Sequence, residues 1–188
     1  MSTTNIMIVG VGGQGTLLAS RILGNAVIRK GYDVKVSEVH GMSQRGGSVI
    51  TYVKYGDKVY SPIIDKGEAD IILAFELLEA YRSLPFLKKG GKILVNNQKI
   101  NPMPVITGAM AYPEDILSKL PQGSVTAIDA LSLAQQAGNA KAVNVVLIGL
   151  LAKSSSISYE DWVETIRATV PPKFLEINLK AFDLGFHS

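Results

Sequence analysis

The sequence predicts an α/β protein: a single Rossmann-like domain over residues 1–188, with a wound, mostly parallel sheet, an inserted β-hairpin and a helical C-terminus. Three observations lead to this fold class. Short apolar runs alternate with helix patterns, as they do in the βα units of parallel sheets. A glycine-rich turn follows the first apolar run and precedes a helix pattern. No linker, internal repeat or low-complexity stretch divides the chain, and its 188 residues suit one hydrophobic core.

The first βα unit is predicted from the N-terminal apolar run. Residues 5–9 form a short strand, and a helix pattern follows over residues 14–30. Gly31 stands just past that helix, where glycine is favoured because it adopts a left-handed conformation easily. A second strand is predicted over residues 34–39. The helix has one apolar face because its apolar residues recur every four positions: Leu18, Ile22 and Ala26.

The next segment predicts the inserted hairpin. Residues 48–55 alternate in polarity, as a half-buried strand does. Gly56-Asp57 is a two-residue turn signal, and residues 58–61 are predicted to return as the second strand. One face of the first strand carries Val49, Thr51, Val53 and Tyr55.

The centre of the sheet is predicted from two further strands. The strand predicted over residues 70–75 is continuously apolar after Asp70, which is typical of a parallel strand covered on both faces. A helix is predicted over residues 77–87, interrupted at Pro85 and stopped by Gly90-Gly91. Residues 92–96 form the next strand.

The C-terminal half begins with a proline-rich passage. Within it we predict a short strand over residues 105–107, and Pro113 opens a helix that ends at Leu120. Residues 125–129 form the last parallel strand. The remainder is predicted to be helical, over residues 131–153 or 141–153, then 159–169 with a capping box from Ser158 and Asp161, then 173–184.

Composition excludes several classes of function. The net charge is only +3 and Lys and Arg form no stripe, so we expect no nucleic-acid partner. There is no cysteine, which excludes disulfides and a cysteine-ligated iron–sulfur cluster in this chain and fits a cytoplasmic protein. The longest apolar stretch, residues 145–152, is too short to span a bilayer, so we expect no membrane segment. The N-terminus lacks the features of a signal peptide.

The glycine-rich turn matches the spacing of a dinucleotide-binding turn. Glycine permits a tight turn and close approach of phosphate, and the following helix N-terminus supplies N–H donors. Glu38 ends the next strand, where a ribose-binding acid would lie. The alternative is a close helix–strand crossing without any ligand. The candidate cofactor-binding residues are Gly10, Gly12, Gly13, Gln14, Gly15, Thr16 and Glu38.

A second glycine-rich element follows the second strand. Loops that leave neighbouring strands at their carboxyl ends converge, so we expect both elements at one edge of the sheet. Arg45 is either a phosphate or carboxylate clamp, or an ion-pair partner of Glu38 or of another subunit. His40 is either structural or catalytic, and Met42 suits an adaptable apolar contact. We assign no catalytic residue and no metal ligand. The candidate partner-facing loop comprises His40, Gly41, Met42, Ser43, Gln44, Arg45, Gly46 and Gly47.

Taken together, the two elements resemble a known family. Gly-Val-Gly-Gly-Gln-Gly from Gly10, followed by Glu-Val-His-Gly-Met-Ser-Gln-Arg-Gly-Gly-Ser-Val from Glu38, is similar to the gamma-type subunit of 2-oxoacid:ferredoxin oxidoreductases. The resemblance covers essentially the whole chain. Within that family of pyruvate, ketoisovalerate and indolepyruvate enzymes, the His-Gly-Met-Ser stretch points to the indolepyruvate class.

The resemblance implies a role in a heteromeric enzyme. These enzymes oxidatively decarboxylate a 2-oxoacid to an acyl-CoA and reduce ferredoxin. Thiamine diphosphate, magnesium and iron–sulfur clusters lie on other subunits. The sequence agrees, because it lacks cysteine and has Asn96-Asn97 without an upstream Gly-Asp-Gly. We therefore expect a larger partner subunit that holds the thiamine diphosphate and the clusters, ferredoxin as a partner of the complex, and no cofactor bound by this chain. This chain would complete the assembly and shape or cover the CoA or substrate site, so that the loop from His40 to Gly47 would face the partner or CoA. The isolated chain is expected to be inactive, and a homodimer is one expected state for it.

Two alternatives from other classes stay open at this point. One is a free-standing Rossmann-type nucleotide-binding oxidoreductase, and the other is a non-enzymatic ligand-binding regulator. An ordinary nicotinamide dehydrogenase fits poorly, because no second domain is available to hold a substrate.

Overall fold

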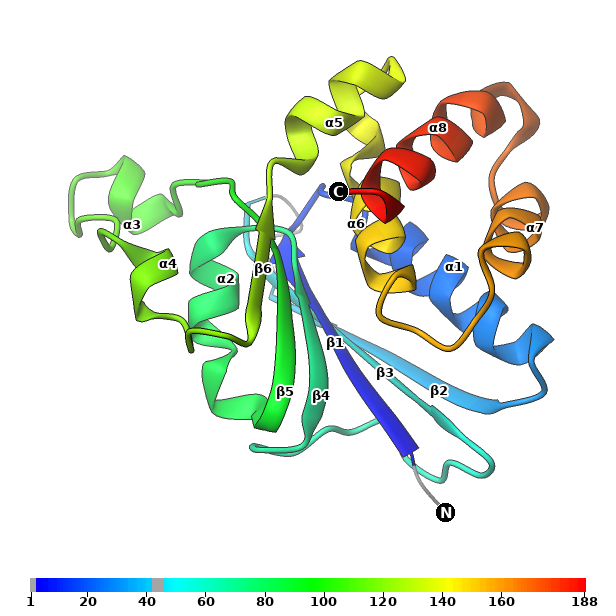
Figure 1. The fold of residues 1–188 in the computed structure, drawn as a ribbon. Helices are drawn as coiled ribbons and strands as arrows, with labels where there is room; N and C mark the ends of the chain where they lie inside the picture. The colour runs from blue at the N-terminus through cyan, green and yellow to red at the C-terminus, as the bar shows by residue number, and fades with distance from the viewer. Residues whose placement is uncertain (1–2, 42–45) are drawn as a thin grey trace.

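The computed structural model describes residues 3–41 and 46–188, and its centre is a six-stranded mixed sheet (Figure 1). The strand order is β2-β3-β1-β4-β5-β6. Strands β1, β4, β5 and β6 run parallel, whereas β3 pairs antiparallel with both β1 and β2. The predicted wound α/β fold is thus confirmed. The strands are β1 (Thr3–Val11), β2 (Asp33–His40), β3 (Ser48–Gly56), β4 (Ala69–Ala74), β5 (Leu87–Asn96) and β6 (Val125–Ile128).

Helices cover both faces of the sheet (Figure 1). One face packs mainly against α1 (Thr16–Arg29) and α6 (Val143–Ala152), with α5 (Ala130–Ala137), α7 (Tyr159–Thr169) and α8 (Leu175–Phe186) outside them. The other face packs against α2 (Leu77–Arg82) and α4 (Ile116–Lys119), with α3 (Met103–Ile106) farther out. Short 3₁₀ turns lie at η1 (Leu84–Phe86), η2 (Ala140–Ala142) and η3 (Pro172–Phe174).

Helix α6 is the centre of the larger helical layer. All ten of its residues are buried, which explains why this stretch is apolar on every side. It packs closely on α8, because Gly149 and Gly185 let the two backbones approach. A Cβ at Gly185 would lie only 1.9 Å from the carbonyl oxygen of Val146. Over the described ranges, no helix combines the length and apolar character needed to cross a membrane.

The predicted hairpin is wrong in its pairing. Ser48–Gly56 forms a strand, but residues 58–61 do not return beside it. Instead β3 lies between β1 and β2, and the hairpin is β2–β3, with the second glycine element as its connection. All nine residues of β3 pair with β1, from Val11↔Ser48 to Thr3↔Gly56. A second strand of only four residues, 58–61, would offer far fewer cross-strand contacts than the pairings of β3 with β1 and β2. The longer pairings are therefore more stable.

In the central region, several predictions that relied on glycine or proline as helix or strand signals are wrong. Gly90-Gly91 lies inside β5 rather than stopping a helix; a Cβ at Gly91 would lie 2.9 Å from the carbonyl oxygen of Ala69. Helix α2 ends at Arg82, and Pro85 falls in the following 3₁₀ turn, as its missing N–H favours. The predicted strand 105–107 is wrong, because Met103–Ile106 is a helical turn with proline near its start.

The helices after residue 112 differ from the predicted ones mainly in where they begin and end. The helix predicted from Pro113 begins at Ile116. Both proposed starts of the next helix are partly right, since α5 and α6 are separate helices divided by Gly138, whose φ is +113°. Helix α7 spans residues 159–169 as predicted, and the backbone N–H of Asp161 donates to the Ser158 hydroxyl oxygen at 3.2 Å. Helix α8 starts and ends two residues later than predicted.

Candidate functional site

The described ends of the two glycine elements lie together at the carboxyl edge of the parallel strands, as the sequence predicts. The backbone N–H of Gly12 donates to the carbonyl oxygen of Gly47 at 2.9 Å, and the N–H of Gly46 donates to the Gly12 carbonyl oxygen at 3.5 Å. This junction continues the β1–β3 ladder, whose last pair is Val11↔Ser48. Met42, Ser43, Gln44 and Arg45, the middle of the predicted partner-facing loop, lie outside the described residues.

Gln14 holds the first glycine turn in shape. Its Oε1 accepts the backbone N–H of Val11 at 2.7 Å, and its Nε2 donates to the carbonyl oxygen of Phe75 at 3.1 Å. The turn is therefore fastened to the end of β4 as well as to β1. Gly10 is required by this arrangement, because a Cβ there would lie 2.8 Å from Gln14 Oε1 and 2.9 Å from Phe75 Cβ.

Gly13 and Gly15 adopt left-handed backbone conformations, with φ of +100° and +84°. Gly15 also contacts α6: the Asn144 Nδ2 donates to its carbonyl oxygen at 3.3 Å. Space around Gly13 is open, whereas a Cβ on Gly15 would lie 2.7 Å from Asn144 Nδ2. The turn thus has open space at Gly13 and is packed against Asn144 at Gly15.

The backbone donors of the turn are only partly used. The N–H of Gly12 donates to Gly47, and the N–H of Gln14 donates to Val11. Within the described ranges, the N–H groups of Gly13, Gly15 and Thr16 have no acceptor. Helix α1 begins at Thr16 without a side-chain cap. A ligand anion at this turn would therefore meet these three donors, because the N–H groups of Gly12 and Gln14 are already used.

A cavity of about 420 Å³ joins the glycine turn to the end of β2. Glu38 lines it from the edge strand and accepts a hydrogen bond from the Thr51 hydroxyl at 3.1 Å. His40 is exposed, and its Nδ1 lies 3.1 Å from the carbonyl oxygen of Gly41. The cavity brings together most of the predicted cofactor-binding residues. Its lining comprises Gly12, Gly13, Gly15, Thr16, Leu17, Glu38, His40 and Val49.

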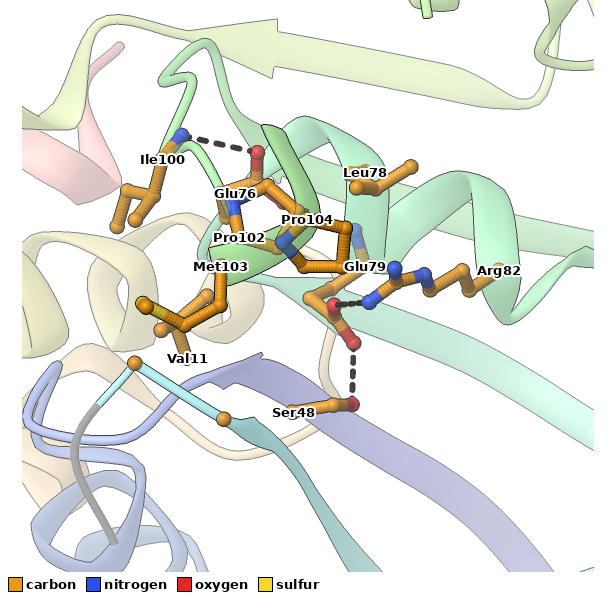
Figure 2. A pocket seen from close by; sticks show the side chains of 12 residues that line it. Val11, Ser48, Glu76, Leu78, Glu79, Arg82, Ile100, Pro102, Met103 and Pro104 are labelled. Carbon is orange, nitrogen blue, oxygen red and sulfur yellow. Dashed lines mark hydrogen bonds and ion pairs between the residues drawn. The ribbon is translucent and has the colours of Figure 1, made fainter. Parts of the chain in front are cut away.

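A second cavity, of about 260 Å³, lies on the other side of the junction and contains two acids that sequence reasoning missed (Figure 2). Glu79 is 3% exposed. Its Oε2 accepts the Ser48 hydroxyl at 2.5 Å, and its Oε1 accepts Nη1 of Arg82 at 2.6 Å. Figure 2 shows this carboxylate between the two donors. The sequence did offer one signal for this site: Glu76 follows the apolar run that ends at Phe75, and a second acid, Glu79, lies three positions later.

Glu76, the first of the two acids, is 1% exposed and connects three segments. Its Oε2 accepts the N–H of Glu79 and so caps α2, at 2.9 Å. Its Oε1 accepts the backbone N–H of Ile100 at 3.1 Å and the Tyr112 hydroxyl. Burial, together with this hydrogen bond to Glu76, raises the pKa of the Tyr112 hydroxyl above its usual range.

Glu76 therefore holds both ends of a projecting segment, residues 98–112, which we call the arm. Figure 1 shows α3 on this arm, outside the sheet. Three large apolar side chains of the arm are exposed: Met103 at 63%, Ile106 at 65% and Met110 at 66%. Met103 also lines the 260 Å³ cavity next to Gly46 and Gly47. The arm and the described end of the second glycine element, Gly46 and Gly47, thus line the same cavity.

Over residues 3–41 and 46–188, no group of three or more His, Cys, Asp or Glu side chains could hold a metal ion. The chain contains no cysteine.

Comparison with known proteins shows that almost the whole chain is similar to one family of proteins. The family model of pyruvate ferredoxin/flavodoxin oxidoreductase matches residues 5–188. The indolepyruvate oxidoreductase subunit IorB of Thermococcus kodakarensis is 47% identical, and that of Pyrococcus horikoshii is 48% identical; each alignment covers 98% of this chain and 95% of the relative. The gamma subunit of a keto/oxoacid ferredoxin oxidoreductase from Geobacter sulfurreducens has a similar structure, with a TM-score of 0.74 and 28% identity over 98% of this chain and 96% of that one.

Proposed function

The chain belongs to the pyruvate ferredoxin/flavodoxin oxidoreductase family, and from that membership we propose that it is the small subunit of an indolepyruvate-type enzyme that decarboxylates a 2-oxoacid to an acyl-CoA. The observation that carries the proposal is the pair of glycine elements, hydrogen-bonded to each other at one edge of the sheet. Their sequence lies within a similarity to indolepyruvate oxidoreductase subunits that spans almost the whole chain.

The chemistry is divided between subunits in this proposal. Thiamine diphosphate with magnesium supplies the carbanion chemistry, and iron–sulfur clusters pass electrons to ferredoxin. The residues of this chain fit neither group, because it has no cysteine and no cluster of metal-ligating side chains within the described ranges. A larger partner subunit is therefore proposed to hold them, and no catalytic step is assigned to a residue of this chain.

The proposed contribution of this chain is to complete the site where CoA arrives. The N–H groups of Gly13, Gly15 and Thr16 lie at the start of α1, beside a cavity of about 420 Å³. An oriented set of backbone donors and a helix N-terminus favour a phosphate group. The loop from His40 to Gly47 would then lie over the meeting point of CoA and the partner subunit, with Arg45 as its charged contact.

The exposed arm supports a partner on this side of the molecule. Exposed methionine is common on interaction surfaces because its side chain adapts to irregular contacts. Met103, Ile106 and Met110 are all more than half exposed, and Met103 lines the same cavity as Gly46 and Gly47. A larger subunit that covers the loop would also cover the arm.

Co-expression with a larger subunit that carries a thiamine-diphosphate site and ferredoxin-type cysteine runs tests the proposal. We expect no 2-oxoacid oxidation by the purified chain, with or without thiamine diphosphate, and CoA-dependent ferredoxin reduction by the purified complex. Met103→Asp should reduce recovery of the larger subunit while leaving the circular-dichroism spectrum of the free chain unchanged. Turnover by the single chain, or normal recovery of the partner by the variant, would contradict the corresponding part of the proposal.

A further inference from the structure

The second glycine element is fastened at its C-terminal end by a buried carboxylate. Ser48 is the first residue of β3 and follows the element directly. Its hydroxyl donates to Glu79, which lies 31 positions later on α2. Arg82 donates to the other carboxylate oxygen. We call these three residues the Glu79 anchor.

The helix that carries Glu79 is itself firmly held. Glu76 caps its N-terminus, and the N–H of Leu77 donates to the carbonyl oxygen of Gln98 at 3.0 Å. Leu77, Leu78 and Ala80 are buried against the sheet. Helix α2 is therefore a fixed point against which the glycine element is positioned.

Because Glu79 is buried, its hydrogen bond from Ser48 matters more for stability than an exposed one would. A carboxylate that is 3% exposed needs hydrogen-bond donors, because an unpaired buried charge is strongly destabilising. Arg82 supplies one donor from a side chain that is 50% exposed. Ser48, which is already paired with Val11 in the β1–β3 ladder, supplies the other, so the carboxylate ties this end of the ladder to α2.

Two independent sets of bonds then meet at the same place. The Glu79 anchor holds Ser48, and the backbone hydrogen bond from the N–H of Gly12 to the Gly47 carbonyl oxygen holds the residue before it. A shift of Ser48 away from α2 would also pull Gly47 from Gly12. Loss of the Ser48–Glu79 contact should therefore disturb the junction between Gly47 and the first glycine turn.

We propose that Glu79 is a positioning residue: through Ser48 it sets the placement of Gly46 and Gly47 against Gly12 of the first glycine turn, and thereby the affinity of the assembled enzyme for CoA. This inference rests on the proposed function, since it assumes that the junction lies at the CoA site. It assigns no contact between Glu79 and substrate. Glu79 acts only through the groups that it holds.

The test uses the complex and the free chain in parallel. In the complex, Ser48→Ala and Glu79→Gln should raise the KM for CoA about tenfold, the effect of losing a hydrogen bond to a charged group, while kcat changes by less than about twofold. In the free chain, amide exchange at Gly12 should accelerate in both variants, because its acceptor on Gly47 loses its support. Ser48→Thr keeps the hydroxyl and should restore both values.

Ser158→Ala is the matched control. Its hydroxyl also donates to a carboxylate at 2.5 Å, that of Asp161, but at the N-terminus of α7, away from the junction. This variant should lower the thermal midpoint of the free chain and leave both the KM for CoA and Gly12 exchange unchanged. If it raises the KM as Ser48→Ala does, the effect is one of stability alone and the proposal is wrong.

The two readouts separate the failure of this inference from the failure of the proposed function. Unchanged Gly12 exchange in Ser48→Ala would overturn the Glu79 anchor whatever the complex does. Faster exchange with an unchanged KM for CoA would show that the anchor holds the junction but that the junction does not serve CoA, which overturns the inference. A complex inactive toward every 2-oxoacid tested would overturn the proposed function and, with it, the link to CoA, while the exchange data still decide the anchor.

Discussion

Replacing Gly15 with alanine tests whether the glycine turn is held by packing against α6 as well as by its backbone conformation. Gly15 has φ of +84°, where a residue with a Cβ is disfavoured by about 1–2 kcal/mol. The new Cβ would lie 2.7 Å from Asn144 Nδ2, so Asn144 must move and its hydrogen bond to the Gly15 carbonyl oxygen is lost. That bond contributes about 1 kcal/mol. Together the two effects should destabilise the chain by about 2–3 kcal/mol.

Gly13→Ala provides the comparison, because Gly13 has a similar positive φ but open space where the Cβ would lie. It should cost only the conformational part, about 1–2 kcal/mol. Thermal unfolding of the free chains should therefore place Gly15→Ala below Gly13→Ala, since about 1 kcal/mol shifts the midpoint of a chain of this size by about 2–4 °C. Asn144→Ala should remove most of the difference in a double-mutant cycle. Equal midpoints for the two glycine variants would refute the packing argument.

Two further predictions concern the loop and the buried tyrosine. Arg45→Ala should leave the circular-dichroism spectrum of the free chain intact and lower turnover of the complex at low CoA; normal assembly with full turnover at low CoA would show that Arg45 is only a local ion-pair partner. Tyr112 has a pKa raised by burial and by its hydrogen bond to Glu76, so ionisation is favoured on unfolding and the stability that the hydroxyl contributes should be lost as pH rises past its unfolded value of about 10. Tyr112→Phe should flatten that alkaline decline in urea titrations, and an unchanged decline would count against the Tyr112–Glu76 contact.

Much of the secondary structure follows from local signals in the sequence. Helix α7 has an amphipathic pattern, a serine cap and a proline beyond its end, and its bounds were predicted to the residue. The six strands were all recognised as apolar or alternating runs, because burial on one or both faces leaves that pattern. Local signals were less reliable where glycine or proline serves a distant contact. Gly91 was predicted to stop a helix, but its lack of a side chain admits the Ala69 carbonyl oxygen from the neighbouring strand.

The errors in pairing have a common physical cause. The alternation of residues 48–55 predicts a strand but not its neighbours, and β3 finds its partners in β1 and β2 rather than in the residues after the turn. The same holds at the site. Ser48 and Glu79 are 31 positions apart, and Glu76 and Tyr112 are 36 apart. Nothing in the local sequence around these side chains predicts their contacts, because the contacts form only when α2 packs beside the glycine junction.

The place of β3 also bears on the alternative of a free-standing nucleotide-binding oxidoreductase. In a dinucleotide-binding unit the ribose-binding acid ends the strand beside β1. Here β3 occupies that place, so Glu38 lies two strand spacings from β1, about 10 Å across the sheet. Its carboxylate already accepts the Thr51 hydroxyl, and the Gly12 N–H already donates to Gly47. The turn keeps donors for one anionic group but shares its edge with the second glycine element. That geometry weighs against a dinucleotide bound in the usual way, with its ribose on an acid at the end of the strand beside β1.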